Sequence, residues 1–195
     1  MKNERNIITV ILLLLLSFLM FGCSSDSETV SATTVTHTQQ GWSAYNSGDY
    51  TQALLNFERA LKSDPEYADA HNGVGWCHLS LSLGVSLALD SFQNAVRYDS
   101  TNADAWVGLA NTLYLRYKDT SDFEDAIKAI DNGLNADTKY LYRHDYYTNA
   151  ELFALKASCY FYLGENEKAQ QEIEKTLRID AANRTAIVLQ DLLKE

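Results

Sequence analysis

The sequence is poor in proline, cysteine, glycine and basic side chains. Its 195 residues include one proline, three cysteines and nine glycines, and 46% of them are hydrophobic. So little proline and glycine argues against a disordered or collagen-like chain. No run rich in valine and isoleucine alternates with polar residues as a half-buried strand would. We therefore expect one all-α domain with a short extra segment.

Basic residues are outnumbered, with 16 lysines and arginines against 26 aspartates and glutamates and a formal net charge of −10. A surface this acidic repels a phosphate backbone, so we expect no nucleic acid among the partners. The charge suits a protein that must stay soluble, and it also suits one that attracts a basic partner.

Catalytic and metal-binding motifs are also missing. There is no glycine-rich phosphate loop, and His144–Asp145, the one pair that resembles an acid–base dyad, has no nucleophile with it. His71 and His78, with Cys77 beside them, are seven residues apart and so about two helical turns apart, too far to share one metal ion. We predict no enzyme activity, cofactor, metal site or small-molecule substrate.

The stretch Gly48–Pro65, GDYTQALLNFERALKSDP, has the pattern of the second helix of a helix-turn-helix pair. Its apolar residues share one helical face, and the proline ends the helix. The pattern of Ala53, Phe57, Ala60, Leu61 and Asp64 recurs as Ala88, Phe92, Ala95, Val96 and Asp99, as Ala126, Ile130, Gly133, Leu134 and Asp137, and as Ala169, Ile173, Thr176, Leu177 and Asp180. The first alanines are 35, 38 and 43 residues apart, which is a repeat of about 34 residues with insertions.

This recurrence resembles the tetratricopeptide repeat family over about residues 35–182. The resemblance implies a right-handed α-solenoid of about four helix-turn-helix repeats with a C-terminal capping helix. The repeats are expected within 37–182, at about 37–66, 67–101, 102–139 and 146–182, with an insertion at 141–149. The capping helix is expected at 183–195, with Asn183 as its N-cap. The insertion either lengthens the next helix or forms a loop.

The first residues have the pattern of an export signal. Lys2 and Arg5 precede a leucine-rich run, and Cys23 follows at its end. The 16 residues from Ile7 to Gly22 fall short of the roughly 20 that span a bilayer, which disfavours an uncleaved membrane helix. This pattern resembles a bacterial lipoprotein signal. It implies a signal peptide at 1–22, palmitate-type acylation of Cys23 and a Ser/Thr-rich tether over 23–36, with Ser24 favouring the outer membrane.

Cys77 and Cys159 take the same position in the second and fourth repeats. Several helix layers of about 8–10 Å separate such positions, more than the roughly 7 Å that a disulfide spans between Cα atoms. We therefore expect two free, buried thiols.

The family resemblance also implies a concave groove lined by the first helix of each repeat, and this groove is the expected binding site for a peptide or protein. Carried over one by one, its residues are Trp42, Tyr45, Asn46, Asp69, Asn72, Trp76, Asp104, Asn111, Tyr114, Glu151, Ser158 and Tyr162. Aromatic, amide and carboxylate groups together suit a peptide backbone and basic side chains. Alternatively, Trp42 and Trp76 are core residues. The lysines and arginines of a clamp for a chaperone's C-terminal tail are missing.

Two functions fit these observations. The first is a membrane-anchored adaptor of the bacterial envelope that binds an unidentified protein or peptide in the groove. The second is a structural subunit of an envelope assembly or secretion complex, held through the convex face or the 141–149 insertion. A repeat architecture alone does not choose between them.

Overall fold

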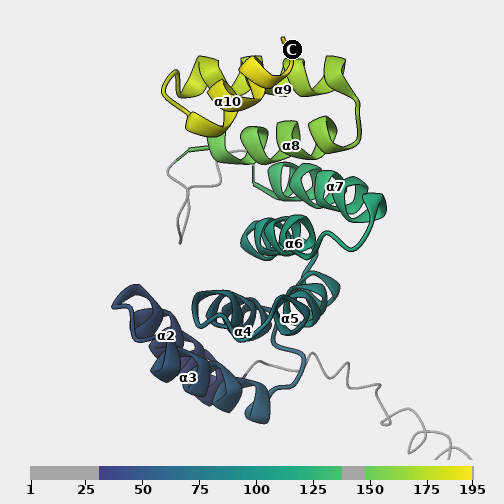
Figure 1. Cartoon of the computed structure of the whole chain (residues 1–195). Coiled ribbons are helices and arrows are strands. Elements are labelled where there is room, and N and C mark those ends of the chain that lie inside the picture. The colour runs from purple at the N-terminus through teal and green to yellow at the C-terminus, as the bar shows by residue number, and fades with distance from the viewer. Residues whose placement is uncertain (1–30, 138–147, 195) are drawn as a thin grey trace, which may run out of the picture.

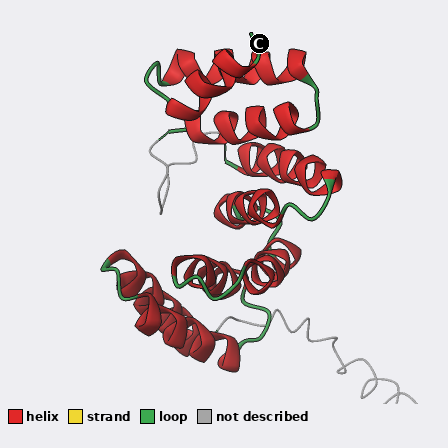
Figure 2. Cartoon of the chain, in the orientation of Figure 1, coloured by secondary structure: helices red, strands yellow, loops and turns green. Residues whose placement is uncertain are grey.

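The computed structural model describes residues 31–137 and 148–194, and within these ranges the chain forms nine α-helices and no strand (Figure 2). The helices are α2 (Ala32–Asn46), α3 (Tyr50–Ser63), α4 (Ala68–Ser80), α5 (Val85–Tyr98), α6 (Ala103–Arg116), α7 (Thr120–Ala136), α8 (Ala150–Tyr162), α9 (Asn166–Ile179) and α10 (Arg184–Leu192). The all-α prediction is confirmed. None of these helices is both long and apolar enough to cross a membrane.

The helices form four antiparallel pairs that follow one another in a curved stack, from α2–α3 to α8–α9, with α10 at the end (Figure 1). Each first helix (α2, α4, α6, α8) contacts the next first helix, whereas the second helices (α3, α5, α7, α9) do not contact one another. The stack therefore bends towards its first helices, which line its inner face. This is the α-solenoid that the repeats predict.

Phenylalanine rings wedged between glycines hold neighbouring helices together. A Cβ atom at Gly41 or at Gly73 would lie within 3 Å of the Phe57 ring, so α2 and α4 approach this ring from two sides. Phe92 is enclosed in the same way by glycines of α4 and α6, Gly75 and Gly108. Close packing at the two α4 glycines therefore joins α4 both to α3, the helix before it, and to α5, the helix after it.

In the third and fourth repeats, isoleucine takes the place of these phenylalanines, and Ile130 and Ile173 are both fully buried. Ile130 belongs to a core that runs from Trp76 in α4 to Cys159 in α8. One apolar core therefore passes through successive repeats, as expected of units that cannot bury their apolar faces alone.

The first helix begins earlier than the sequence predicts. We expected a tether up to residue 36 and a helix from about His37, but α2 starts at Ala32 and its N-cap is Ser31, whose side chain accepts from the backbone N–H of Thr34. The hydroxyl groups of Thr36 and Thr38 donate to carbonyl groups four residues earlier, and Thr38 is buried. A stretch rich in Ser and Thr looks like a flexible tether because these residues usually compete with the helix backbone for hydrogen bonds.

The last helix caps the stack as predicted. Asn183 is the N-cap of α10, and its side chain accepts from the backbone N–H of Ala186. Ala186 and Leu189 bury their side chains against Ala157 and Ile173 of the last repeat. The helix thus covers an apolar face that a fifth repeat would otherwise cover.

Several expectations fall on residues outside the described ranges. These are the signal peptide, Cys23, the pair His144–Asp145 and most of the 141–149 insertion. Of that insertion, only Thr148 and Asn149 are described, and they directly precede the first residue of α8.

Candidate functional site

Two indole groups link successive repeats along the inner face. The Nε1–H of Trp42 in α2 donates to Oδ2 of Asp69 in α4 over 3.0 Å. One repeat further on, the Nε1–H of Trp76 in α4 donates to Oδ2 of Asp104 in α6 over 3.2 Å. Each of these carboxylates is the second residue of its helix, where the helix dipole favours negative charge. The same tryptophan–aspartate hydrogen bond therefore joins α2 to α4 and α4 to α6 on the inner face.

Some of the predicted groove residues are buried beneath the surface of the inner face. Asp104 also accepts from Nδ2 of Asn72 over 2.6 Å, and Asn72, Trp76 and Asp104 are 0%, 7% and 5% exposed. Ser158 is 4% exposed and donates to the carbonyl of Ala154. Asn72, Trp76 and Asp104 are therefore buried rather than exposed along an open groove, and Trp76 is a core residue, as the alternative given above has it. Ser158 is also buried, although it borders the second hollow described below. Neighbouring first helices approach so closely here that their polar groups bond to one another.

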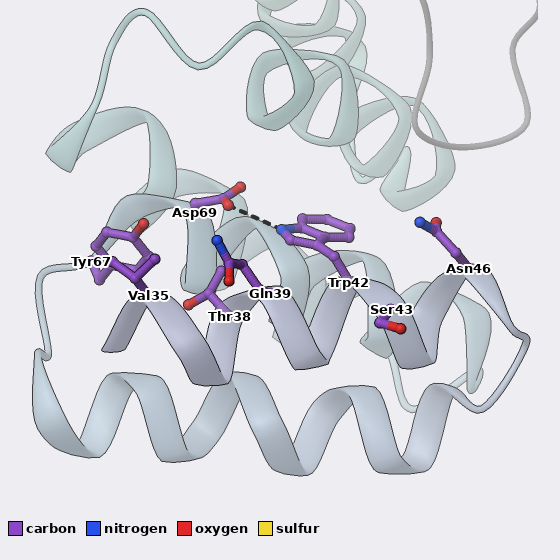
Figure 3. Close-up of a pocket in the computed structure, with 8 residues that line it drawn as sticks. All are labelled: Val35, Thr38, Gln39, Trp42, Ser43, Asn46, Tyr67 and Asp69. Carbon is purple, nitrogen blue, oxygen red and sulfur yellow. Dashed lines mark hydrogen bonds between the residues drawn. The ribbon is translucent and has the colours of Figure 1, made fainter. Parts of the chain in front are cut away.

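A first hollow of about 500 Å³ opens between α2 and the start of α4 (Figure 3). Figure 3 shows Gln39 and Trp42 pointing from α2 towards Asp69, and the indole held by the bond to that carboxylate. The residues that line it are Val35, Thr38, Gln39, Trp42, Ser43, Asn46, Tyr67 and Asp69. Asp69 is the only charged residue among them. The first hollow thus offers apolar surface, amides, hydroxyls and one carboxylate.

A second hollow of about 210 Å³ lies at the other end of the inner face, where α6, α8 and the start of α10 meet. Its lining is Tyr114, Glu151, Ala154, Leu155, Ser158, Asn183 and Thr185. Glu151 accepts from the backbone N–H and the hydroxyl of Thr148, and burial raises the pKa of Tyr114. Asn183 was predicted only as an N-cap, but it also lines this hollow.

The remaining predicted groove residues, Tyr45, Asn111 and Tyr162, line neither hollow. The Tyr45 hydroxyl lies 2.9 Å from that of Ser80, and the Asn111 side chain donates to the carbonyl of Val107. Tyr162 is 55% exposed and stacks on Phe123, at the end of α8. The structure therefore brings Trp42, Asn46 and Asp69 together in the first hollow, and Tyr114, Glu151 and Ser158 in the second.

The sequence prediction missed part of the first hollow. Val35, Gln39, Ser43 and Tyr67 line it, although none of them was selected as a groove residue. Val35, Gln39, Trp42 and Asn46 follow one another at helical spacing. This spacing was a usable signal, but it was hidden because the first turn of α2 was assigned to the tether.

Reactive side chains are buried or engaged elsewhere. Cys77 and Cys159 are free and buried, as expected, and burial raises the pKa of each thiol to about 12. The Nε2–H of His71 donates to the carbonyl of Pro65, and its ring stacks on Tyr98. Within residues 31–137 and 148–194, no three His, Cys, Asp or Glu side chains are grouped to hold a metal ion.

Comparison with known proteins agrees with this arrangement. Residues 38–83 and 150–183 each match a sequence model of the tetratricopeptide repeat. No curated protein matches the chain.

Among solved structures, a crystal structure of MamA protein superposes with a TM-score of 0.66 at 23% identity, over 83% of this chain and 80% of that one. The structure from the functional characterization of Pseudomonas aeruginosa pilF has a TM-score of 0.65 at 22% identity, over 83% of this chain and 67% of that one. The first tetratricopeptide repeat domain of Spaghetti (RPAP3), bound to the HSP90 peptide SRMEEVD, has a TM-score of 0.57 at 13% identity, over 70% of this chain and 99% of that one.

At these identities the likeness establishes the fold, while the two matched segments establish the repeat type. The helix pairs, the inner face and the matched segments agree: the chain is a tetratricopeptide repeat protein.

Proposed function

We propose that this chain is a lipid-anchored adaptor of the bacterial envelope that binds a segment of a partner protein in the first hollow. The observation that carries this proposal is the hollow itself, a recess of about 500 Å³ on the inner face of a tetratricopeptide repeat stack. Proteins of this architecture bind protein or peptide partners, and one structural neighbour holds a peptide. An adaptor needs only such a surface and no catalytic group.

The lining of the first hollow indicates what it would bind. The amides of Gln39 and Asn46 can pair with the backbone of an extended segment, while Val35 and Trp42 offer apolar contact. Asp69 contributes the one negative charge, and no lysine or arginine lines the hollow. The occupant is therefore a neutral or basic segment. An acidic segment such as the peptide SRMEEVD in the Spaghetti structure would meet repulsion here.

The bond between Trp42 and Asp69 also affects affinity. Because the carboxylate holds the indole in place before any partner arrives, the ring loses little rotational freedom on binding. Tryptophan is also among the residues that contribute most to protein interfaces. We therefore assign Trp42 as the main contact and Asp69 as the residue that positions it.

Site-specific crosslinking tests the hollow. A photo-crosslinking amino acid at Gln39, in the hollow, is compared with the same amino acid at Gln93 and Lys128, which are exposed on the second helices α5 and α7. A covalent adduct from position 39 but not from 93 or 128 is the expected result. An adduct from 93 or 128 alone would overturn the proposal and favour a subunit held through its convex face.

The anchor rests on the sequence pattern before Cys23 and has its own test. When cells expressing the full chain are extracted with a detergent that separates into two phases, the native chain should enter the detergent phase. A Cys23→Ser variant should stay in the aqueous phase, because one acyl chain contributes about 0.8 kcal/mol per buried CH₂ group. Equal partitioning of both forms would refute the anchor and leave the hollow untouched.

A further inference from the structure

The turn between α6 and α7 contains an unusual residue. In the first and fourth repeats, the turn between the two helices has a glycine with positive φ, Gly48 at 84° and Gly164 at 73°. In the corresponding turns, the second repeat has Ser82 at φ 53° and the third repeat has Tyr117 at φ 32°. Positive φ strains a bulky side chain, whereas glycine adopts it without steric cost. A tyrosine here must have a compensating role, in packing or in binding.

The ring of Tyr117 belongs to a group of aromatic rings at the surface. It stacks on Phe123 with centroids 4.8 Å apart and planes 22° apart, and Phe123 stacks on Tyr162 at 5.2 Å and 12°. Phe123 is 2% exposed, but Tyr117 and Tyr162 are 59% and 55% exposed. We call Tyr117, Phe123 and Tyr162 the aromatic plate. Its two tyrosine rings are exposed to solvent, and both stack on the buried ring of Phe123.

The turn is fixed by a buried carboxylate. Asp122, whose side chain is 1% exposed, accepts from the guanidinium of Arg116 and, over 2.7 Å, from the backbone N–H of Lys118. Asp119 caps α7 by accepting from the backbone N–H of Ser121. Residues on both sides of Tyr117 are thus tied to the start of α7. The turn that carries Tyr117 is therefore ordered before any partner arrives, which lowers the entropy cost of binding.

We infer that the aromatic plate binds an arginine side chain of a partner protein. The face of a tyrosine ring attracts cations, and a planar, weakly hydrated guanidinium stacks on it better than an ammonium. The charge around the plate has the matching sign. Residues 116–125 contain four carboxylates and two basic side chains. Arg116 pairs with Asp122 and Asp125 pairs with Lys128, which leaves Asp119 and Glu124 against Lys118. This surface is separate from the first hollow and does not depend on the function proposed for it.

The test uses the full chain and a short peptide, acetyl-Gly-Arg-Arg-Gly-amide, as the probe. Nuclear magnetic resonance of labelled tyrosine rings should show saturable shifts for Tyr117 and Tyr162, but none for Tyr50 in α3. A peptide with uncharged citrulline in place of arginine should bind about tenfold more weakly, because it keeps the shape and loses the charge. Equal binding of both peptides would overturn the inference.

The Tyr117→Gly variant separates binding from folding. It installs the residue found at the first and fourth turns, so its melting temperature should equal or exceed that of the native chain, while the arginine peptide binds about fivefold more weakly. A Tyr162→Leu variant should lose a similar factor. If Tyr117→Gly melts well below the native chain, or binds the peptide equally well, the ring serves the fold alone and the inference is wrong.

Discussion

Replacing Gly73 by alanine should destabilise the protein, although alanine is the better helix former. The added Cβ would lie 2.3 Å from Cζ of Phe57 and 2.4 and 2.5 Å from two further ring atoms. The ring has little room to move away, because it is fully buried and a Cβ at Gly41 of α2, on its other side, would lie 2.5 Å from it. Overpacking of this kind costs about 1–3 kcal/mol, and the severe overlap favours the upper end. Helix propensity returns about 1 kcal/mol, which leaves a net loss of about 2 kcal/mol.

Urea unfolding followed by circular dichroism measures this loss, and Gly133→Ala is the matched control. Gly133 is also a buried helical glycine, but the nearest atom to its added Cβ is the Cβ of Trp106 at 3.3 Å. The control should therefore change stability by less than about 1 kcal/mol in either direction. In a double variant, Phe57→Leu should make room for the Cβ of Gly73→Ala. The double variant should therefore lose less unfolding free energy than the sum of the losses of the two single variants. If Gly73→Ala is as stable as the native chain, the wedged-ring account of the stack is wrong.

Three further predictions concern the end of the stack, an ion pair and the thiols. Deleting residues 183–195 should uncover the core beneath α10, so amide hydrogen exchange should accelerate in α8 and α9 and stay unchanged in α2 to α5. Exchange rates in α8 and α9 equal to those of the native chain would contradict this. The hydrogen bond from Arg116 lowers the pKa of Asp122, so this pair stabilises the fold above the ordinary pKa of 3.8, and the contribution is lost as the pH falls below it. Asp122→Asn should cost about 2 kcal/mol at neutral pH and make urea stability less sensitive to acid, and an unchanged acid dependence would refute the assignment. Cys77 and Cys159, whose pKa values are about 12 against an ordinary 9.0, should resist iodoacetamide at pH 8 in the native state and react in urea. Because the thiols ionise more readily in the unfolded chain, they should lower the free energy of unfolding only above pH 9. Rapid labelling of the native protein would show that they are not buried.

The repeat architecture could be predicted because its signal is local and recurs. The spacing of Ala53, Phe57 and Ala60 defines one helical face, and three further copies identify the stack. The start of α2 could not be predicted in the same way. Ser and Thr residues there look like a flexible tether, and only burial of Thr34 and Thr38 against the rest of the stack shows that they form a helix.

The candidate site was only partly predictable, for a different reason. Repeat positions show which face of a helix turns inward, but not how closely the next repeat covers that face. Trp42 and Trp76 occupy matching places and make the same bond to a carboxylate of the next repeat. Trp42 nevertheless lines a hollow, while Trp76 is buried among α4, α6 and their neighbours. That difference in exposure depends on how closely neighbouring repeats pack, which the spacing of residues in the sequence does not show.

The most direct test of the central proposal is the affinity of the crosslinked partner for the full chain when the first hollow is filled. Gln39→Trp places a large ring in the hollow, and Gln93→Trp places the same ring on the exposed surface of α5. Calorimetry should show at least a tenfold loss of affinity, about 1.4 kcal/mol, for Gln39→Trp and none for Gln93→Trp. Equal affinity of both variants and the native chain would show that the partner binds elsewhere and that the first hollow is not the site.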